Sequence, residues 1–198
     1  DFYVNISESR DNLDYEIDGI VYKIDSYEQQ KKLGFTSRSP RWALAHKFPA
    51  ENITTKLLNV NFQVGRTGII TPVAELEEAT IGGVKINRST LHNEDEVKRL
   101  GIRIGDTITL QRAGDVIPKI INVIISNRNG SEKEINFSKK CPSCNKGLKK
   151  SKKEVALRCL NYEGCKEQII HRIRHFVSRK GFNIDGLGEK QIRLFWYQ

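Results

Sequence analysis

The hydrophobic and polar positions of the first fifty residues or so suggest two short strands with a helix between them. Residues 14–25 read as a strand built around Ile17, Ile20, Val21 and Ile24. YEQQKKLG, residues 27–34, predicts a short helix that Gly34 ends, and residues 42–51 form a second strand-like stretch that ends at Pro49. Because about 50 residues are too few to bury an α/β core, we expect this segment to be the tail of a larger α/β domain.

After Glu51 the pattern changes to a series of short strands. We predict five of them, at residues 56–65, 69–76, 84–91, 106–114 and 116–126. A helix is predicted between the third and fourth, over HNEDEVKRLG, with Asn93 as N-cap, Glu96 three positions later and Gly101 just past the end. This is the element order of an OB-fold barrel. Such barrels bind single strands, duplex backbones or oligosaccharides, so the fold alone does not decide the function.

The last third of the chain carries the cysteines and two further helices. Residues 167–181 place an apolar stripe on one face of a helix: Ile169, Ile170, Ile173, Phe176 and Val177. The turn Asp185-Gly186-Leu187-Gly188 then leads into another helix. Together these elements predict a helix–hairpin–helix pattern, in which the backbone amides around the two glycines could bind a phosphate.

The charge of the chain is concentrated in one segment. The 198 residues include 33 Lys and Arg and 24 Asp and Glu, a formal net charge of +9. Residues 139–180 contain 13 basic and 3 acidic residues, a net charge of +10, so the remainder is close to neutral. This segment indicates a polyanionic partner, with a solvated lysine-rich face as the alternative.

Two absences in the sequence affect the interpretation. The sequence contains no methionine, so we expect it to be a portion of a longer protein. No run of about 18 apolar residues occurs and the start lacks an apolar signal region, so we expect no membrane association and a cytoplasmic location.

All four cysteines lie within a stretch of 25 residues. Cys141 and Cys144 form a CxxC knuckle, and Cys159 and Cys165 follow after gaps of 14 and 5 residues. Four thiolates in two close pairs fit tetrahedral Zn²⁺ and leave no position for a substrate, which predicts a structural site. Four reduced cysteines without a metal are the alternative.

Several charged residues occupy positions where strands usually carry apolar ones. Lys47 lies among apolar residues in ALAHKFP, where a lysine is expected to face an anion. Asp18 and Lys23 flank a strand, and alternation would place them on opposite faces unless Asp18 precedes the strand or Gly19 forms a bulge. A solvated lysine is the alternative for Lys23.

Two further groups fall at the predicted rim of the barrel. Arg66-Thr67-Gly68 occupies the turn between the first two barrel strands, and Arg112 and Gly114 end the fourth. Rim positions are where such barrels contact their ligands, although ordinary turn chemistry would also explain these residues.

Taken in order, these pieces closely resemble the bacterial NAD-dependent DNA ligases. The resemblance runs from about Arg10 to the end of the chain. It is carried by EIDGIVYK, PRWALAHKFPAE, VGRTGIITPVA, STLHNEDEV, RIGDTITLQRAGDVIP, the Cys₄ segment and HFVSRKGFNIDGLGEKQI.

The resemblance implies roles for residues of the N-terminal segment. Asp18 matches a catalytic carboxylate near a metal ion, Mg²⁺ or Mn²⁺. Lys23 matches a nucleotide contact, Lys47 a contact to the adenylate phosphate, and Arg10 a functionally important arginine that we assign to DNA binding.

It also implies roles in the rest of the chain. In the barrel, the positions that match contacts to nicked DNA, or support for catalysis, are Arg66, Thr67, Arg112, Val116 and Ile117. Gly186 and Gly188 of the GLG turn are expected to contact DNA, and the four cysteines match zinc ligands.

The fold class that follows is a multidomain, mainly β chain with an α/β part. We expect the end of an adenylation (nucleotidyltransferase) domain at residues 1–52, a five-stranded OB-fold barrel at 53–138, a Cys₄ zinc finger at 139–166 and the start of a helix–hairpin–helix domain at 167–198.

The resemblance implies a nick-sealing activity. In the family a lysine of a KxDG motif attacks NAD, AMP passes to a 5′-phosphate, and a 3′-hydroxyl displaces it. KxDG does not occur in this sequence, so we expect no activity from the chain alone. A non-catalytic nucleic-acid-binding module is the alternative, and the Cys₄ and GLG segments disfavour an ATP-dependent ligase. The expected partner is nicked duplex DNA, bound by a monomer in the nucleoid.

Overall fold

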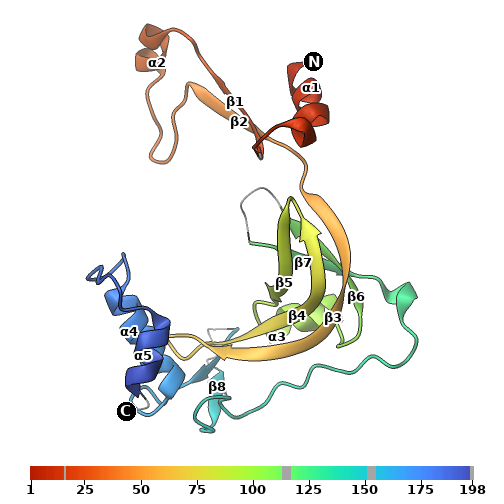
Figure 1. Cartoon of the computed structure of the whole chain (residues 1–198), viewed down its shortest axis with the longest axis vertical. Helices are drawn as coiled ribbons and strands as arrows, with labels where there is room; N and C mark the ends of the chain where they lie inside the picture. The colour runs from red at the N-terminus through yellow and green to blue at the C-terminus, as the bar shows by residue number, and fades with distance from the viewer. Residues whose placement is uncertain (16, 113–116, 151–154, 197–198) are drawn as a thin grey trace.

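The computed structural model describes residues 1–198 except 16, 113–116, 151–154 and 197–198. An N-terminal ribbon with two helices leads into a β-barrel, and a small cysteine-rich unit with two helices lies at the other end of the barrel (Figure 1). None of the helices in the described part of the chain is long and apolar enough to cross a membrane.

The N-terminal segment comprises five elements. These are α1 (Phe2–Ser9), the 3₁₀ helix η1 (Arg10–Asn12), β1 (Gly19–Lys23), α2 (Tyr27–Leu33) and β2 (Ala43–Lys47). The predicted α2 is confirmed, with Ser26 as N-cap and Gly34 at φ 63° behind its last turn. β1 and β2 pair in antiparallel fashion but are shorter than the predicted strands. Among the described side chains up to Ala50 only Phe48 is buried, so this segment has no core of its own.

The barrel contains the predicted strands and helix in the predicted order. Its elements are β3 (Glu51–Val64), β4 (Ile70–Ile81), β5 (Val84–Thr90), α3 (Glu94–Leu100), β6 (Thr107–Arg112) and β7 (Lys119–Val123). They close in the order β3-β4-β5-β7-β6, which confirms the OB-fold expectation. The side chain of Asn93 accepts a hydrogen bond from the Glu96 amide and Gly101 is left-handed, so both predicted caps of α3 are confirmed.

Three barrel strands differ clearly from the sequence expectation, and one of them, β4, continues to Ile81 instead of ending at residue 76. β3 begins at Glu51 instead of residue 56, because residues 51–56 pair with β6 before the rest of the strand pairs with β4. β7 begins only at Lys119, after Pro118, and ends before the 3₁₀ helix η2 (Ile125–Asn127), so the predicted strand 116–126 is too long.

The barrel interior holds the main hydrophobic core. Its most deeply buried side chains are Leu57, Ala74, Leu91, Ile108, Leu110 and Ile120. One acid is buried beside it: Asp106 accepts bonds from the Arg128 guanidinium at 2.7 and 2.8 Å and from the Arg103 amide at 2.6 Å. This ion pair fastens the segment after η2 to the barrel.

The C-terminal part contains β8 (Leu148–Lys150), β9 (Leu157–Cys159), α4 (Lys166–Val177) and α5 (Glu189–Trp196). Ile170, Val177 and Ile192 form a small core between the two helices. The predicted apolar stripe of α4 is only partly buried, since Ile173 and Phe176 are exposed while the polar Gln168 is fully buried. The packing of α4 against the cysteine-rich unit therefore includes a buried glutamine, which a search for hydrophobic periodicity cannot identify.

Candidate functional site

Lys47 and Asp18 form an ion pair at the base of the β1–β2 ribbon. The Lys47 ammonium donates to Asp18 Oδ2 at 2.7 Å. Asp18 precedes β1, so it escapes strand alternation, and Gly19 lies directly opposite Lys47 in the register. A Cβ on Gly19 would lie 2.6 Å from the Lys47 Cα, so this close approach of the two strands requires glycine. The hydrogen bond from Lys47, with the charge of its ammonium, holds the pKa of Asp18 below its usual value.

Lys23 lies at the far end of the same ribbon. The register pairs Gly19 with Lys47 and Lys23 with Ala43, so the two lysines project from the same face. Lys23 lies four positions along the strand from Gly19, which corresponds to roughly 13 Å. The structure therefore brings Asp18 to Lys47 and not to Lys23, and the two lysines form an exposed basic track along the ribbon.

A cavity of about 770 Å³ lies where the N-terminal segment meets the barrel. Three predicted site residues line it, namely Arg10, Asp18 and Arg112. Arg10 pairs with the carboxylate of Glu51, which also accepts from the Gly82 amide at 3.0 Å. The Arg112 guanidinium donates to the Gly82 carbonyl at 2.8 Å, in the turn between β4 and β5.

Glu51 thus links the two parts of the chain, and sequence reasoning missed it. In the sequence it is only the acid that ends FPAE, and nothing local indicates that it meets residues 41 positions before and 31 positions after it. Through these contacts Glu51 connects Arg10 with the turn that Arg112 also contacts, and both arginines line the same cavity.

The other predicted barrel contacts lie elsewhere. Ile117 is 75% exposed and lines a shallow pocket with Arg88 and Arg112. Val116 falls outside the described residues. Arg66 and Thr67 are exposed in the turn after β3, at the opposite end of that strand from Glu51.

The four predicted cysteines converge on one point. Their sulfur atoms all lie within 4.8 Å of one another, with 3.5 Å between Cys144 and Cys159 and 3.9 Å between Cys141 and Cys165. Tetrahedral zinc with Zn–S bonds of about 2.3 Å requires sulfur separations near ~3.8 Å. None of the four is in a disulfide, and burial raises the pKa of Cys159 to about 12. The donor set fits Zn²⁺, which would complete the small core that these cysteines share with Val64 and Ile70 of the barrel.

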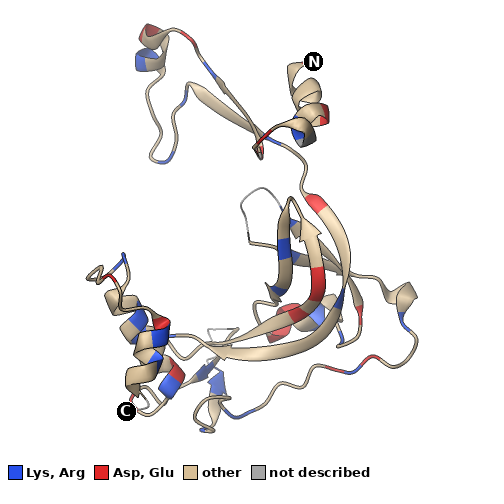
Figure 2. Ribbon diagram, in the orientation of Figure 1, with Lys and Arg blue, Asp and Glu red and all other residues tan. Residues whose placement is uncertain are grey.

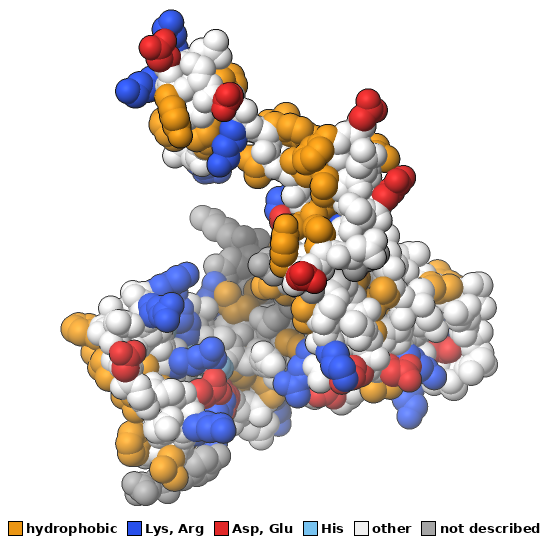
Figure 3. Space-filling view, turned by 45° about the horizontal axis from the view of Figure 1, so that its top comes forward, with side chains coloured by type: hydrophobic (Ala, Val, Ile, Leu, Met, Phe, Trp, Pro, Cys, Tyr) orange, Lys and Arg blue, Asp and Glu red, His pale blue; other side chains and the backbone are white. Residues whose placement is uncertain are grey.

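The GLG turn is exposed ahead of α5, with Gly186 at φ 81°. The first helical residue is Glu189, whose carboxylate accepts from Arg174 and Arg193, each at 2.9 Å. Glu189 thus places a carboxylate in the first turn of α5, next to the positive end of the helix dipole. The DNA contacts expected of Gly186 and Gly188 stay predictions. Lys and Arg side chains gather on the surface of the helical unit (Figures 2 and 3), in agreement with the basic segment at residues 139–180.

Comparison with known proteins gives three family matches in succession. Residues 1–51 match the adenylation domain of NAD-dependent DNA ligase, residues 54–132 its OB-fold domain and residues 140–166 its C4 zinc finger domain. Among curated relatives, the chain is 50% identical over 200 residues to the DNA ligase of Xanthobacter autotrophicus, covering 98% of the chain and 28% of the relative. It is 52% identical over 187 residues to the DNA ligase of Bacillus velezensis, covering 94% and 28%. The chain therefore spans somewhat over a quarter of the length of these relatives.

Proposed function

This chain belongs to the family of NAD-dependent DNA ligases, and from that premise we propose that it takes part in sealing nicks in duplex DNA with NAD as adenylate donor. The observation that carries the proposal is the succession of three family matches in one chain. Lys23 and Lys47 fall within the adenylation-domain match, nearly all of the barrel within the OB-fold match and the cysteine cluster within the zinc-finger match.

The nucleotide would be held by the N-terminal ribbon. We assign the adenylate phosphate to Lys47 and a further nucleotide contact to Lys23, because both ammonium groups project from one face. Asp18 keeps the Lys47 ammonium at the base of the ribbon until a phosphate oxygen replaces it. Phosphoryl and nucleotidyl transfer depend mainly on positioned positive charge, which these groups supply.

If Mg²⁺ (or Mn²⁺) binds at Asp18, most of its ligands must come from the nucleotide and from water. Among the described residues, the four cysteines are the only group of three or more His, Cys, Asp or Glu ligands. Asp18 is one carboxylate, already paired with Lys47. It can hold such a cation only together with phosphate oxygens and water, which is the usual pattern for Mg²⁺ at nucleotides.

Duplex DNA would be bound through its phosphates. Arg10 and Arg112 at the cavity, Ile117 beside it, and Arg66 with Thr67 at the far turn supply contacts without an element shaped to read base edges. By the family resemblance, Val116, Gly186 and Gly188 are assigned to DNA contact as well. We further propose that the protein acts as a monomer in the cytoplasm, associated with the nucleoid.

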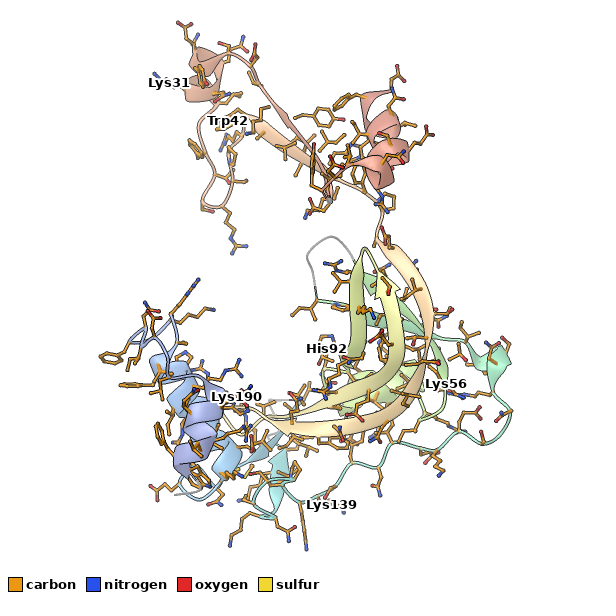
Figure 4. The ribbon with its side chains drawn as sticks, viewed as in Figure 1. Lys31, Trp42, Lys56, His92, Lys139 and Lys190 are labelled. Atoms are coloured by element: carbon orange, nitrogen blue, oxygen red, sulfur yellow. The ribbon has the colours of Figure 1, made fainter. Side chains whose placement is uncertain are left out.

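A chimera tests this function. The 198-residue sequence replaces the segment it matches in the DNA ligase of Bacillus velezensis, and nick sealing is measured with NAD. We expect sealing, and we expect Lys47→Ala in the chimera to slow enzyme adenylation by about 10²–10³ while nick binding is retained. Lys31→Ala, an exposed lysine of α2 (Figure 4), is the matched control.

A second candidate function is a non-catalytic nucleic-acid-binding module. It is favoured by the basic segment at residues 139–180, with its net charge of +10. Under that reading Lys47→Ala would leave the chimera as active as Lys31→Ala does, and the proposed nucleotide role would be lost.

A further inference from the structure

The turn that carries Arg66 and Thr67 is held by its backbone on the cysteine-rich unit. The amide of Cys159 donates to the Gly68 carbonyl at 2.9 Å, and the Arg158 guanidinium donates to the Thr67 carbonyl at 3.1 Å. Ile69 and Arg158 form an antiparallel bridge. The barrel turn and β9 thus form a small sheet-like joint, where the β3–β4 end approaches the cysteine-rich unit in Figure 1.

Gly68 fits this joint because it has no side chain. Its φ is 80°, and a Cβ there would lie 2.2 Å from the Cys159 carbonyl oxygen. The Gly68 amide also closes the turn by donating to the Gly65 carbonyl at 2.9 Å. This glycine is therefore fixed both by the turn and by its neighbour across the joint.

Gln168 of α4 contacts both sides of the joint, Cys159 and Gly68. Its side chain is fully buried in α4 and its Nε2 donates to the Cys159 carbonyl at 3.0 Å. Its Oε1 lies 3.1 Å from the position of a Cβ on Gly68 and has no hydrogen-bond partner among the residues that the structure describes. A buried amide oxygen without a hydrogen-bond partner costs free energy. The hydrogen bond from Nε2 to the Cys159 carbonyl and the packing against Gly68 offset this cost.

We propose that Gln168 and Arg158 are positioning residues that lock the turn 65–69 in the form that presents Arg66 and Thr67 to nicked DNA. The inference rests on the proposed function, in which those two side chains contact DNA. The turn exposes the side chains of Arg66 and Thr67, while Gly68 beside them is buried in the joint. Cys159 belongs to the cysteine cluster and also forms hydrogen bonds with Gly68 and Gln168. It therefore connects the candidate zinc site directly to the turn 65–69.

The first test measures the joint itself in the 198-residue chain. Gln168→Leu keeps a buried side chain of similar size and removes the donor, and Gln191→Leu on the neighbouring α5 is an exposed control. Amide exchange at Gly65, Gly68 and Cys159 is followed by NMR together with zinc content. We expect exchange to rise about fivefold to tenfold in Gln168→Leu with zinc retained. Unchanged exchange at these amides would overturn the inference.

A second variant covers the case in which Gln168→Leu does not fold. Arg158→Gln removes the bond to the Thr67 carbonyl, and Lys149→Gln, its partner in the β8–β9 register, removes the same charge without touching the turn. Faster exchange at Gly68 in Arg158→Gln than in Lys149→Gln supports the inference, and equal exchange in the two contradicts it.

The last test separates positioning from the proposed function. Affinity for a nicked duplex is measured for Gln168→Leu with Arg66 and Thr67 intact, and again in an Arg66→Ala, Thr67→Ala background. If Gln168 acts through the turn, its loss of about fivefold to tenfold disappears in that background. An equal loss in both backgrounds refutes positioning. Full affinity in the Arg66→Ala, Thr67→Ala protein would instead refute the DNA role of the turn, while the exchange measurement would still decide whether the joint exists.

Discussion

Removing Asp106 tests whether the link between the barrel and the segment after η2 stabilises the fold. The Asp106 side chain has no exposed surface, and it accepts three hydrogen bonds, two of them from the Arg128 guanidinium. Asp106→Leu removes the carboxylate and leaves the Arg103 amide and the Arg128 guanidinium without their acceptor. Breaking a buried ion pair from one side costs about 3–5 kcal/mol, and because Arg128 retains some access to water the lower end, ~3 kcal/mol, is expected.

The magnitude is large enough to measure in the thermal transition of the barrel. For a domain of this size each kcal/mol lowers Tm by about 4–8 °C, so Asp106→Leu should lower it by roughly 12 °C or more. Neither tryptophan, Trp42 or Trp196, lies in the barrel, so far-UV circular dichroism or amide exchange is the suitable probe.

The matched control is an ion pair of the same geometry on the surface. Arg99 donates to both oxygens of Glu96 at 2.7 and 2.8 Å, but its side chain is 61% exposed against 21% for Arg128. Arg99→Met is expected to change Tm little, whereas Arg128→Met leaves a buried carboxylate unpaired and should lower Tm at least as much as Asp106→Leu. Equal Tm values for Arg99→Met and Arg128→Met would refute the reasoning from burial.

Three further predictions follow from the sites. Elemental analysis should find one zinc per chain, and Cys159→Ser should speed amide exchange in residues 139–150 and 155–166 while most barrel amides keep their protection; a metal-free but folded cysteine unit would contradict the site. The binding of duplex DNA should fall with salt at a log–log slope of about −5, if roughly half of the 13 basic residues in 139–180 meet phosphates; a flat dependence would exclude the electrostatic account. Lys47 lowers the pKa of Asp18 in the folded protein. The pair therefore stabilises the fold at pH values above the pKa that Asp18 has in the unfolded chain, and this contribution is lost as the pH falls through the lower pKa of the folded state. In an NMR titration Lys47→Ala should move the Asp18 midpoint upward, and an unmoved midpoint would show that the pair does not persist in solution.

The order of the elements was predictable because local signals agree with one another. Alternation defines the barrel strands, and the caps at Asn93 and Gly101 define α3 within one or two residues. The first part of β3 was missed because residues 51–55 are mostly polar. Thr55 is buried there, and its hydroxyl bonds the Glu77 carbonyl on the next strand, which no local pattern reveals.

Site contacts were less predictable because they depend on long-range pairing. Lys47 and Asp18 are 29 positions apart, and the β1–β2 register decides that Asp18 meets Lys47 instead of the nearer Lys23. Glu51 and Gln168 carry no motif at all. Each becomes important only because a backbone group from a distant segment reaches it, Gly82 in one case and Cys159 in the other.

Strand β3 connects the cavity near Glu51 to the turn 65–69 that contacts the cysteine-rich unit. Glu51 begins the strand and contacts Arg10 and Gly82, and the strand ends at Val64, just before the turn held on the cysteine-rich unit. The strand is paired nearly throughout, first with β6 and then with β4, so its two ends cannot move independently without breaking the barrel ladder. At about 3.3 Å per residue the path from Glu51 to Arg66 is at most roughly 50 Å, so contacts at its two ends can span at most about 15 base pairs of a duplex that rises about 3.4 Å per base pair. Under the proposed function, the cavity and the turn would contact phosphates within a stretch of duplex no longer than that, and the proposed joint at Gln168 would fix the position of the turn at one end of it.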